Sequence, residues 1–173
     1  MMDTPPIQNN YAFYFLGDTL HKIGETMIID TITPYDELWS KVRNYAGQCS
    51  WRAGKALADA MDRQAFCDWE RVIAAFDGEN ICGYCTVAKT DCIPDVPYTP
   101  YIGFLFVDEA YRGNRLSQQM IRYAMEYLKS VGFDVVYLVS DHVNLYEKYG
   151  FQVIDRKIAP WGSEEKIYMQ KIG

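Results

Sequence analysis

Apolar residues recur at helical spacing after residue 115, and this is the most regular segment of the sequence. Its apolar positions are Leu116, Met120, Ala124, Tyr127, Leu128 and Val131. Polar residues such as Gln119, Arg122 and Glu126 fall on the other side, which is typical of a helix packed with one face against a core. Gly132 predicts the helix end, and residues 134–139 then indicate an apolar strand buried on both faces.

Further strands are predicted before this helix. The apolar run YIGFLFV (101–107) precedes it, so that strand, helix and strand form a right-handed βαβ unit with two parallel strands. Residues 71–76 and 81–88 are apolar runs joined by Asp77-Gly78-Glu79-Asn80. An Asp-Gly pair between two such runs indicates a hairpin, which makes these two strands antiparallel.

The N-terminal part predicts one strand and two helices. Residues 27–33 indicate a short strand, and Pro34 suits the first turn of a helix. A second helix is expected after Ser50. The first 25 residues mix aromatic residues and glycines without a clear period, and we interpret them as an N-terminal extension of open structure.

The C-terminal part completes the predicted fold. A short helix is expected within residues 142–151, and residues 151–158 and 165–172 alternate well enough to form two antiparallel strands. The sequence thus predicts an α/β (α+β) fold: a mixed sheet of six to seven strands, mostly antiparallel with a central parallel junction, flanked by about four helices. A length of 173 residues with 49% apolar content suits one domain over residues 1–173, with one active site.

Charge and composition exclude some classes of function. The net charge of −6 and the lack of a basic block disfavour nucleic-acid binding and mildly favour a cationic partner. No apolar run approaches the roughly 20 residues of a membrane span. The start MMDTPPIQNN does not resemble a secretory signal, so five cysteines read as reduced thiols and a cytoplasmic location is expected.

Cys82 and Cys85 form the one spacing that suggests metal or redox chemistry. Because this segment reads as a strand, residues three apart should face opposite sides of the sheet. With only His21 and His142 as further nitrogen ligands, we expect no metal site and interpret both thiols as buried structural residues.

The segment from Tyr111 to Ser117 joins a predicted strand to the start of the long helix. Several backbone N–H groups at such a start have no partner within the helix. The helix dipole adds about 0.3–1 kcal/mol for each nearby negative charge, and Arg112 and Arg115 add positive charge. A pyrophosphate group suits this turn, although from the turn alone an ordinary connection with solvated arginines explains the same residues.

Two motifs give this region a resemblance to a known family. The segment VDEAYRGNRLS (107–117) resembles the acetyl-CoA signature V-x-P-x-Y-R-G-x-G-x-G/A of the GNAT N-acetyltransferases. The family positions in register are Val107, Tyr111, Arg112 and Gly113. The segment LYEKYGF (145–151) resembles the family's L-Y-E-K-x-G-F. Arg115 and Ser117 depart from the family's small residues, which implies a looser approach of phosphate to the backbone.

The resemblance implies how the coenzyme binds. The backbone of Leu105, Phe106 and Val107 should pair with the pantetheine arm like one more strand. The residues expected to hold the pyrophosphate are Arg112, Gly113, Asn114, Arg115, Leu116 and Ser117. Asn144 is a further candidate for coenzyme contact. The implied cosubstrate is acetyl-CoA, and no metal is implied.

The resemblance also assigns an acid. Tyr146 matches the tyrosine that commonly protonates the leaving thiolate of the coenzyme. A phenol with a pKa of about 10 can donate to a thiolate whose conjugate acid has a pKa of about 8.5 or higher.

A base is needed as well, because an amine with a pKa of about 10.4 is almost wholly protonated near neutral pH. The candidates are Asp91, Asp95, Asp108, Glu109 and His142, or a water relay. His142 is favoured because free histidine titrates near neutrality. No cysteine sits in a recognisable nucleophile–base pair, so direct transfer without a covalent enzyme intermediate is predicted.

The predicted function is therefore acetyl transfer from acetyl-CoA to a primary amine of a small molecule. Two alternatives stay open: acetylation of a protein N-terminus or lysine, and a regulatory module that binds acyl-CoA without turnover. The sequence leaves open the identity of the amine, the acyl-chain preference and the oligomeric state, with a homodimer among the options.

Overall fold

One seven-stranded sheet organises the protein. The computed structural model describes residues 27–66 and 68–173, so the N-terminal extension (1–25) lies outside the described residues. The strands are β1 (Ile28–Ile32), β2 (Arg71–Asp77), β3 (Asn80–Ala88), β4 (Tyr101–Val107), β5 (Val135–Ser140), β6 (Gln152–Ile158) and β7 (Glu164–Lys171). They follow the order β1-β2-β3-β4-β5-β7-β6. Every neighbouring pair is antiparallel except β4 and β5, which are parallel.

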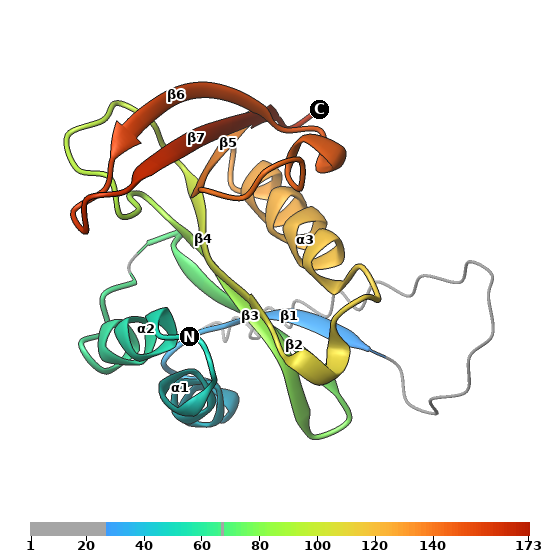
Figure 1. The fold of residues 1–173 in the computed structure, drawn as a ribbon. Helices are drawn as coiled ribbons and strands as arrows, with labels where there is room; N and C mark the ends of the chain where they lie inside the picture. Colours follow the sequence, from blue (N-terminus) through green and yellow to red (C-terminus); the bar gives the residue numbers. More distant parts are fainter. Residues whose placement is uncertain (1–26, 67) are drawn as a thin grey trace, which may run out of the picture.

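Helices cover both faces of this sheet. Within the described ranges they are α1 (Leu38–Gln48), α2 (Ala53–Asp62), α3 (Leu116–Ser130) and the single 3-10 turns η1 (Glu109–Tyr111) and η2 (Glu147–Tyr149). The α1 and α2 helices lie together on one face and α3 lies on the other (Figure 1). Met120 of α3 belongs to one buried cluster with Cys85, whereas Val42 and Leu57 share a second cluster with Tyr84. The sheet therefore separates these two clusters.

The observed architecture confirms the predicted mixed sheet with a parallel junction near its middle. The βαβ unit is β4, α3 and β5, and the hairpin joins β2 to β3 with Asp77 opposite Asn80. The short helix expected within residues 142–151 is the 3-10 turn η2, so three longer helices accompany the sheet.

The chain enters α1 through a turn rather than through the proline. Thr33 donates two hydrogen bonds to the Asp36 carboxylate, from its backbone N–H at 2.6 Å and from its hydroxyl at 2.7 Å. A side chain that captures nearby backbone groups competes with helix formation. The helix consequently begins at Leu38, and Pro34 lies before it.

Cys82 and Cys85 share one face of the sheet, so the prediction that they face opposite sides is wrong. The register of β2 with β3 shifts between Ala75 and Phe76 and leaves one extra residue in β3. Such a bulge interrupts the alternation of side chains. Both thiols join the buried cluster under α3, and burial raises the pKa of each.

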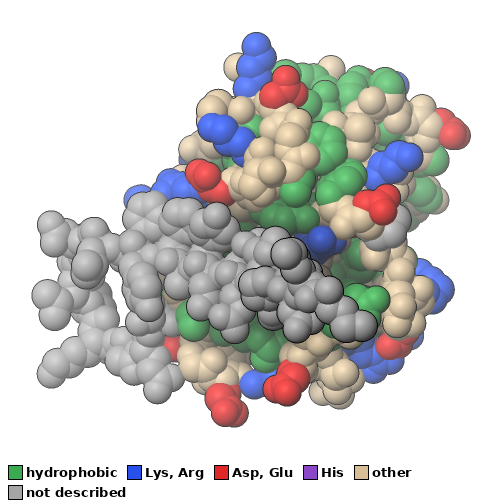
Figure 2. Space-filling view, turned by 180° about the vertical axis from the view of Figure 1, so that it is seen from behind, with side chains coloured by type: hydrophobic (Ala, Val, Ile, Leu, Met, Phe, Trp, Pro, Cys, Tyr) green, Lys and Arg blue, Asp and Glu red, His purple; other side chains and the backbone are tan. Residues whose placement is uncertain are grey.

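The described surface mixes charge types. On the back of the molecule, Lys and Arg side chains are scattered among Asp and Glu side chains rather than gathered in one continuous patch (Figure 2). Exposed apolar side chains of β6 and the following turn are Val153, Ile154, Ile158 and Trp161. Among the described residues, none of the helices has the length and apolar character needed to cross a membrane.

Candidate active site

The site begins where the two parallel strands separate. The β4 and β5 strands share a single register pair, Tyr101 with Tyr137, and the Tyr137 N–H donates to the Pro100 carbonyl at 2.9 Å. Beyond this pair the strands diverge (Figure 1). The backbone of Leu105 and Phe106 therefore lies along a strand edge that β5 does not cover, and ligands of such sheets bind at this kind of opening.

The β4 strand is irregular in this open stretch. Its register with β3 shifts so that Phe104 and Leu105 lie opposite Cys85. Phe104 has a φ of 47°, in a region that bulky residues rarely adopt. Because a bulge breaks the ladder, the backbone groups beside it are available to a ligand.

The turn after β4 leads directly into α3. Gly113 has a φ of 82°, and Arg115, the residue before the helix, has a φ of 57°. A Cβ added to Gly113 would have no atom of a described residue within 4 Å, so the described part of the chain leaves this side of the turn open. The first backbone N–H groups of an α-helix have no partner within the helix. The residues predicted to bind an anion therefore lie at the start of α3, with Arg115 in a conformation that glycine favours.

The two arginines of the turn differ in their contacts. Arg112 folds back onto β4: its Nε donates to the Val107 carbonyl at 3.0 Å, and its Nη2 lies 3.0 Å from the Glu109 carboxylate. Its guanidinium also lies 5.8 Å from the centre of the Phe106 ring. Arg115 is exposed and forms no ion pair within the described part of the chain. Of the two, Arg115 is the cation available to a phosphate.

Ser117 links the two sequence motifs. Its hydroxyl lies 3.1 Å from the hydroxyl of Tyr149, which belongs to η2 in the second motif. Sequence reasoning did not single out Tyr149, because it occupies the variable position of L-Y-E-K-x-G-F. The departure at Ser117 is thus accompanied by a hydrogen bond that ties the helix start to η2.

Tyr146 precedes η2 and is buried. Its ring packs against Tyr168, with ring centres 5.5 Å apart, and against Phe151 at 6.3 Å. Burial raises the pKa of Tyr146 to about 12, although a hydrogen bond with Ser140 acts in the opposite direction. The phenol therefore stays protonated across the physiological pH range, as a proton donor must.

His142 and Asn144 lie on the exposed loop between β5 and η2. The His142 Nδ1 is 3.0 Å from the Ser140 hydroxyl and 3.3 Å from the Asp141 carboxylate. The His142 ring centre lies 6.2 Å from that of Tyr146. Asn144 has a φ of 60°, a conformation that asparagine adopts more readily than most residues. The structure thus brings His142 close to Tyr146, and Asn144 lies on the same loop.

Asp108 and Glu109 are engaged in structural contacts. The Tyr45 hydroxyl donates to Asp108 at 2.6 Å, and this hydrogen bond holds the pKa of Asp108 below its usual value. Glu109 accepts a hydrogen bond from Ser50, which likewise lowers its pKa, and pairs with Arg112. These carboxylates join α1 and the following loop to the turn, and their lowered pKa values make them weak bases.

Asp91 is the base candidate with the most enclosed carboxylate. It is half-buried, and burial raises its pKa to about 6. Its neighbours Tyr101 and Glu165 are buried. The charge of Glu165 raises the pKa of Asp91, and the charge of Asp91 raises the pKa of Tyr101. The sequence analysis missed Glu165, although its position two residues before Ile167 on a predicted strand indicated a buried side chain.

Acetyl-CoA fits the residues present. An open strand edge at β4 can pair with the amide groups of a pantetheine arm, and free N–H groups at the start of α3 suit a pyrophosphate. Arg115 supplies a positive charge beside them that forms no ion pair with any described residue. The site residues therefore match the donor set that this cosubstrate needs.

A family model covers most of the same region. Residues 36–151 match the model described as the acetyltransferase (GNAT) family. This range contains α1, α2, the β4 opening, the turn before α3 and both sequence motifs. No curated protein matches the sequence.

Solved structures share the fold at low sequence identity. An aminoglycoside 6'-N-acetyltransferase from Enterococcus faecium superposes with a TM-score of 0.65 at 17% identity, over 84% of this chain and 97% of that one. A GNAT family N-acetyltransferase from Escherichia coli, solved with CoA, has a TM-score of 0.64 at 20% identity, over 88% and 86%. A chain of the NatC complex bound to Gag peptide and CoA has a TM-score of 0.61 at 16% identity, over 85% and 99%.

Proposed function

Because the chain belongs to the GNAT acetyltransferase family, we propose that it transfers the acetyl group of acetyl-CoA directly to a primary amine of a small molecule. The observation that carries the proposal is the opening between β4 and β5. The turn before α3 follows the uncovered edge of β4, and Leu105 and Val107 of that strand pack against the buried cluster that contains Tyr146, which supports the proposal. These are the parts that thioester binding and thiolate protonation require.

The turn before α3 and strand β4 bind the cosubstrate. The backbone N–H groups of residues 113–117 and the Arg115 side chain hold the pyrophosphate, and the edge of β4 at Leu105–Val107 pairs with the pantetheine arm. Asn144 extends the contact from the facing loop. Acetyl-CoA supplies the acetyl group as an activated thioester.

Tyr146 protonates the departing sulfur. Its pKa of about 12 keeps the proton in place until the thiolate forms, and burial of that thiolate raises the pKa of the thiol in the same direction. His142 contributes an imidazole whose ring centre lies 6.2 Å from that of Tyr146.

The acidic character of the chain supports a small cationic acceptor. The net charge is −6, and an acidic cleft attracts cations. A peptide acceptor is the second candidate, because the fold is shared with a complex that holds a peptide. A module without turnover is disfavoured by the buried Tyr146 phenol, because binding of acyl-CoA alone needs no proton donor beside the thioester.

The test is release of free thiol from acetyl-CoA across a panel of amines, aminoglycosides and peptides with free N-termini. Mass spectrometry of the products identifies the acetylated nitrogen. Turnover with small amines supports the proposal. Turnover with peptides alone would show that the acceptor is a peptide instead. Tight acetyl-CoA binding without turnover on any member of the panel would indicate a module that binds acyl-CoA without catalysis.

A further inference from the structure

We propose that Asp91, Tyr101 and Glu165 form the acceptor site, which binds the primary ammonium group of a small cationic amine and removes its proton through Asp91. This inference rests on the proposed function and names the base and the substrate class that the proposed function leaves open. It also makes Asp91, rather than His142, the catalytic base.

The Asp91 carboxylate lies directly over the β4 backbone. A Cβ added to Gly103 would be 3.4 Å from Asp91 Oδ2 and 3.3 Å from the Thr86 hydroxyl. Gly103 immediately precedes Phe104, where the strand bulges. Because Gly103 has no side chain, the carboxylate contacts the strand next to the uncovered edge.

Tyr101 contributes a buried hydroxyl that no described residue satisfies. The side chain is 1% exposed, and its Oη has no hydrogen bond to any described residue. After burial, Asp91 is the group that raises the pKa of Tyr101 most. A buried hydroxyl without a partner is costly, and an ammonium donor held by Asp91 would satisfy it.

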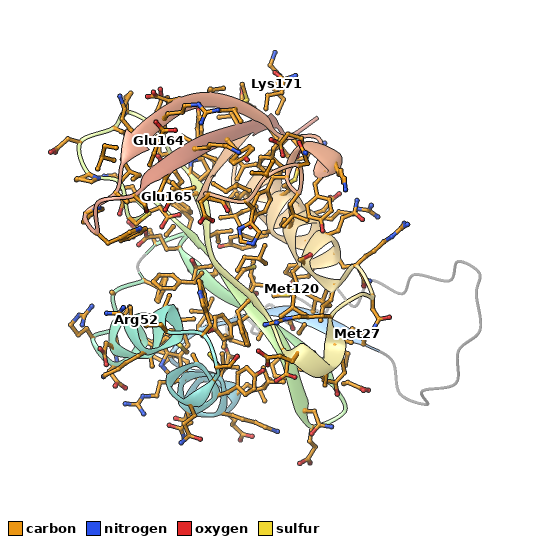
Figure 3. The ribbon with its side chains drawn as sticks, viewed as in Figure 1. Met27, Arg52, Met120, Glu164, Glu165 and Lys171 are labelled. Atoms are coloured by element: carbon orange, nitrogen blue, oxygen red, sulfur yellow. The ribbon has the colours of Figure 1, made fainter. Side chains whose placement is uncertain are left out.

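Glu165 adds a second buried carboxylate. It is 6% exposed, and it accepts hydrogen bonds from the Ser163 hydroxyl at 2.9 Å and the Trp161 indole at 3.3 Å. In Figure 3, Glu165 lies on the side of β7 nearer the α1 and α2 layer, whereas Glu164 lies on the outer side. Its charge raises the pKa of Asp91.

The two carboxylates lack a compensating cation in the described ranges. Neither Asp91 nor Glu165 forms an ion pair with a Lys, Arg or His there. Buried negative charge is unfavourable unless a cation pairs with it. A bound ammonium supplies that cation, and its three N–H donors match two carboxylates and one hydroxyl.

The groups around Asp91 suit it to proton removal near neutral pH. It faces Glu165 on β7, Tyr101 on β4, Cys92 beside it and Tyr146 across the opening. Burial by these neighbours raises its pKa to about 6, close to the range in which a general base works best.

The proton balance of the step is complete. The ammonium gives one proton to Asp91, and the freed nitrogen lone pair forms the C–N bond to the acetyl carbon as the C–S bond breaks. Tyr146 gives its proton to the leaving sulfur. The second proton lost by the nitrogen replaces the proton of Tyr146, and the proton on Asp91 passes to solvent.

The enclosure favours a slim acceptor over a peptide chain. The loop that carries Asp91 packs on the hairpin of β6 and β7, since Ile93 and Ala159 belong to one buried cluster with Tyr101 and Ile167. We therefore expect the half-buried Asp91 carboxylate to accept a primary ammonium on an unbranched carbon chain more readily than a branched amine. An α-amine with flanking peptide groups would have to displace the loop.

The experiment uses the full chain with 1,4-diaminobutane as the probe amine and n-butanol as its uncharged control. Binding is measured by calorimetry at saturating CoA, and turnover by thiol release from acetyl-CoA between pH 5 and pH 9. The variants are Asp91→Asn, Asp91→Glu and Tyr101→Phe. Asp95→Asn is the matched control, because it removes the same charge from an exposed position of the same loop.

We expect Asp91→Asn to lower kcat/KM at least about 100-fold, within the usual range for loss of a base. It should abolish diamine binding and remove the fall in kcat/KM below about pH 6. Asp91→Glu should restore part of the rate, and Asp95→Asn should stay within about 2-fold of the wild type.

Equal behaviour of Asp91→Asn and Asp95→Asn in both assays would overturn the acceptor site, and turnover by all variants would still uphold acetyl transfer. Asp91-dependent binding of the diamine without thiol release would uphold the site and refute the proposed transfer. Absence of both binding and turnover in the wild type would overturn the site as well.

Discussion

Arg115 holds a left-handed conformation at the start of α3, and its replacement tests the geometry of the coenzyme turn. Its φ of 57° and ψ of 24° cost a residue with a Cβ about 1–2 kcal/mol, and cost glycine nothing. Glycine loses more backbone entropy on folding than alanine, which lowers the free energy of unfolding by about 0.5–1 kcal/mol. We therefore expect Arg115→Gly to unfold with a free energy about 0.5–1 kcal/mol higher than Arg115→Ala.

Urea unfolding without CoA measures this difference, because both variants lose the same charge. Calorimetry with CoA measures the contribution of the charge, and both variants should bind about 1.5- to 5-fold more weakly than the wild type, since an exposed ion pair contributes about 0.2–1 kcal/mol. A lower free energy of unfolding for Arg115→Gly than for Arg115→Ala would refute the left-handed conformation at residue 115. Unchanged CoA affinity in both would remove Arg115 from the phosphate site.

Three further predictions follow from particular contacts. Asp91→Asn should stabilise the free protein by about 3 kcal/mol at pH 7.5, because the folded pKa of about 6 exceeds the unfolded value of about 4. The folded wild type then binds more protons than the unfolded chain, so its free energy of unfolding falls as the pH rises from 4 to 6. Thermal unfolding at pH 4 should show no difference between the wild type and Asp91→Asn. A difference that stays constant from pH 4 to pH 7.5 would contradict an origin in the Asp91 charge. Ser117→Ala and Tyr149→Phe should each cost about 0.5–1.5 kcal/mol in urea unfolding, and a double variant that costs their sum would argue against the 3.1 Å bond. Gly54→Ala should cost about 1–3 kcal/mol in the same assay, because the added Cβ would lie 2.3 Å from the Ala46 carbonyl, whereas Gly47→Ala, with its nearest atom at 3.5 Å, should be neutral or stabilising.

The periodic segments of the sequence were sufficient to predict the order of elements. The helix at Leu116–Ser130 and the strands around it follow from side-chain period alone, because each buries one face or both faces against a core. The hairpin at Asp77–Asn80 follows from its turn residues. These features are local, so a single sequence contains them.

Other features depend on contacts distant in the sequence. The bulge at Cys82 exists only through its pairing with β2, so the two thiols could not be placed on one face beforehand. The structural roles of Asp108 and Glu109 depend on hydrogen bonds from Tyr45 and Ser50, which lie about 60 positions earlier in the sequence.

The enclosure of Asp91 has the same origin. It arises from Tyr101 and Glu165, which only the folded sheet brings near, and the loop from Asp91 to Pro100 shows no period that would have placed it. His142 was preferred on residue type alone, and the structure leaves that side chain exposed.

We propose that the opening between β4 and β5 is a catalytic acetyl-transfer site in which Tyr146 is the acid. The most direct test compares Tyr146→Phe with the wild type in thiol release from acetyl-CoA, with CoA affinity measured in parallel. We expect kcat to fall about 100-fold or more with CoA affinity unchanged, because only the proton donor is lost. A Tyr146→Phe variant that turns over at the wild-type rate would contradict it.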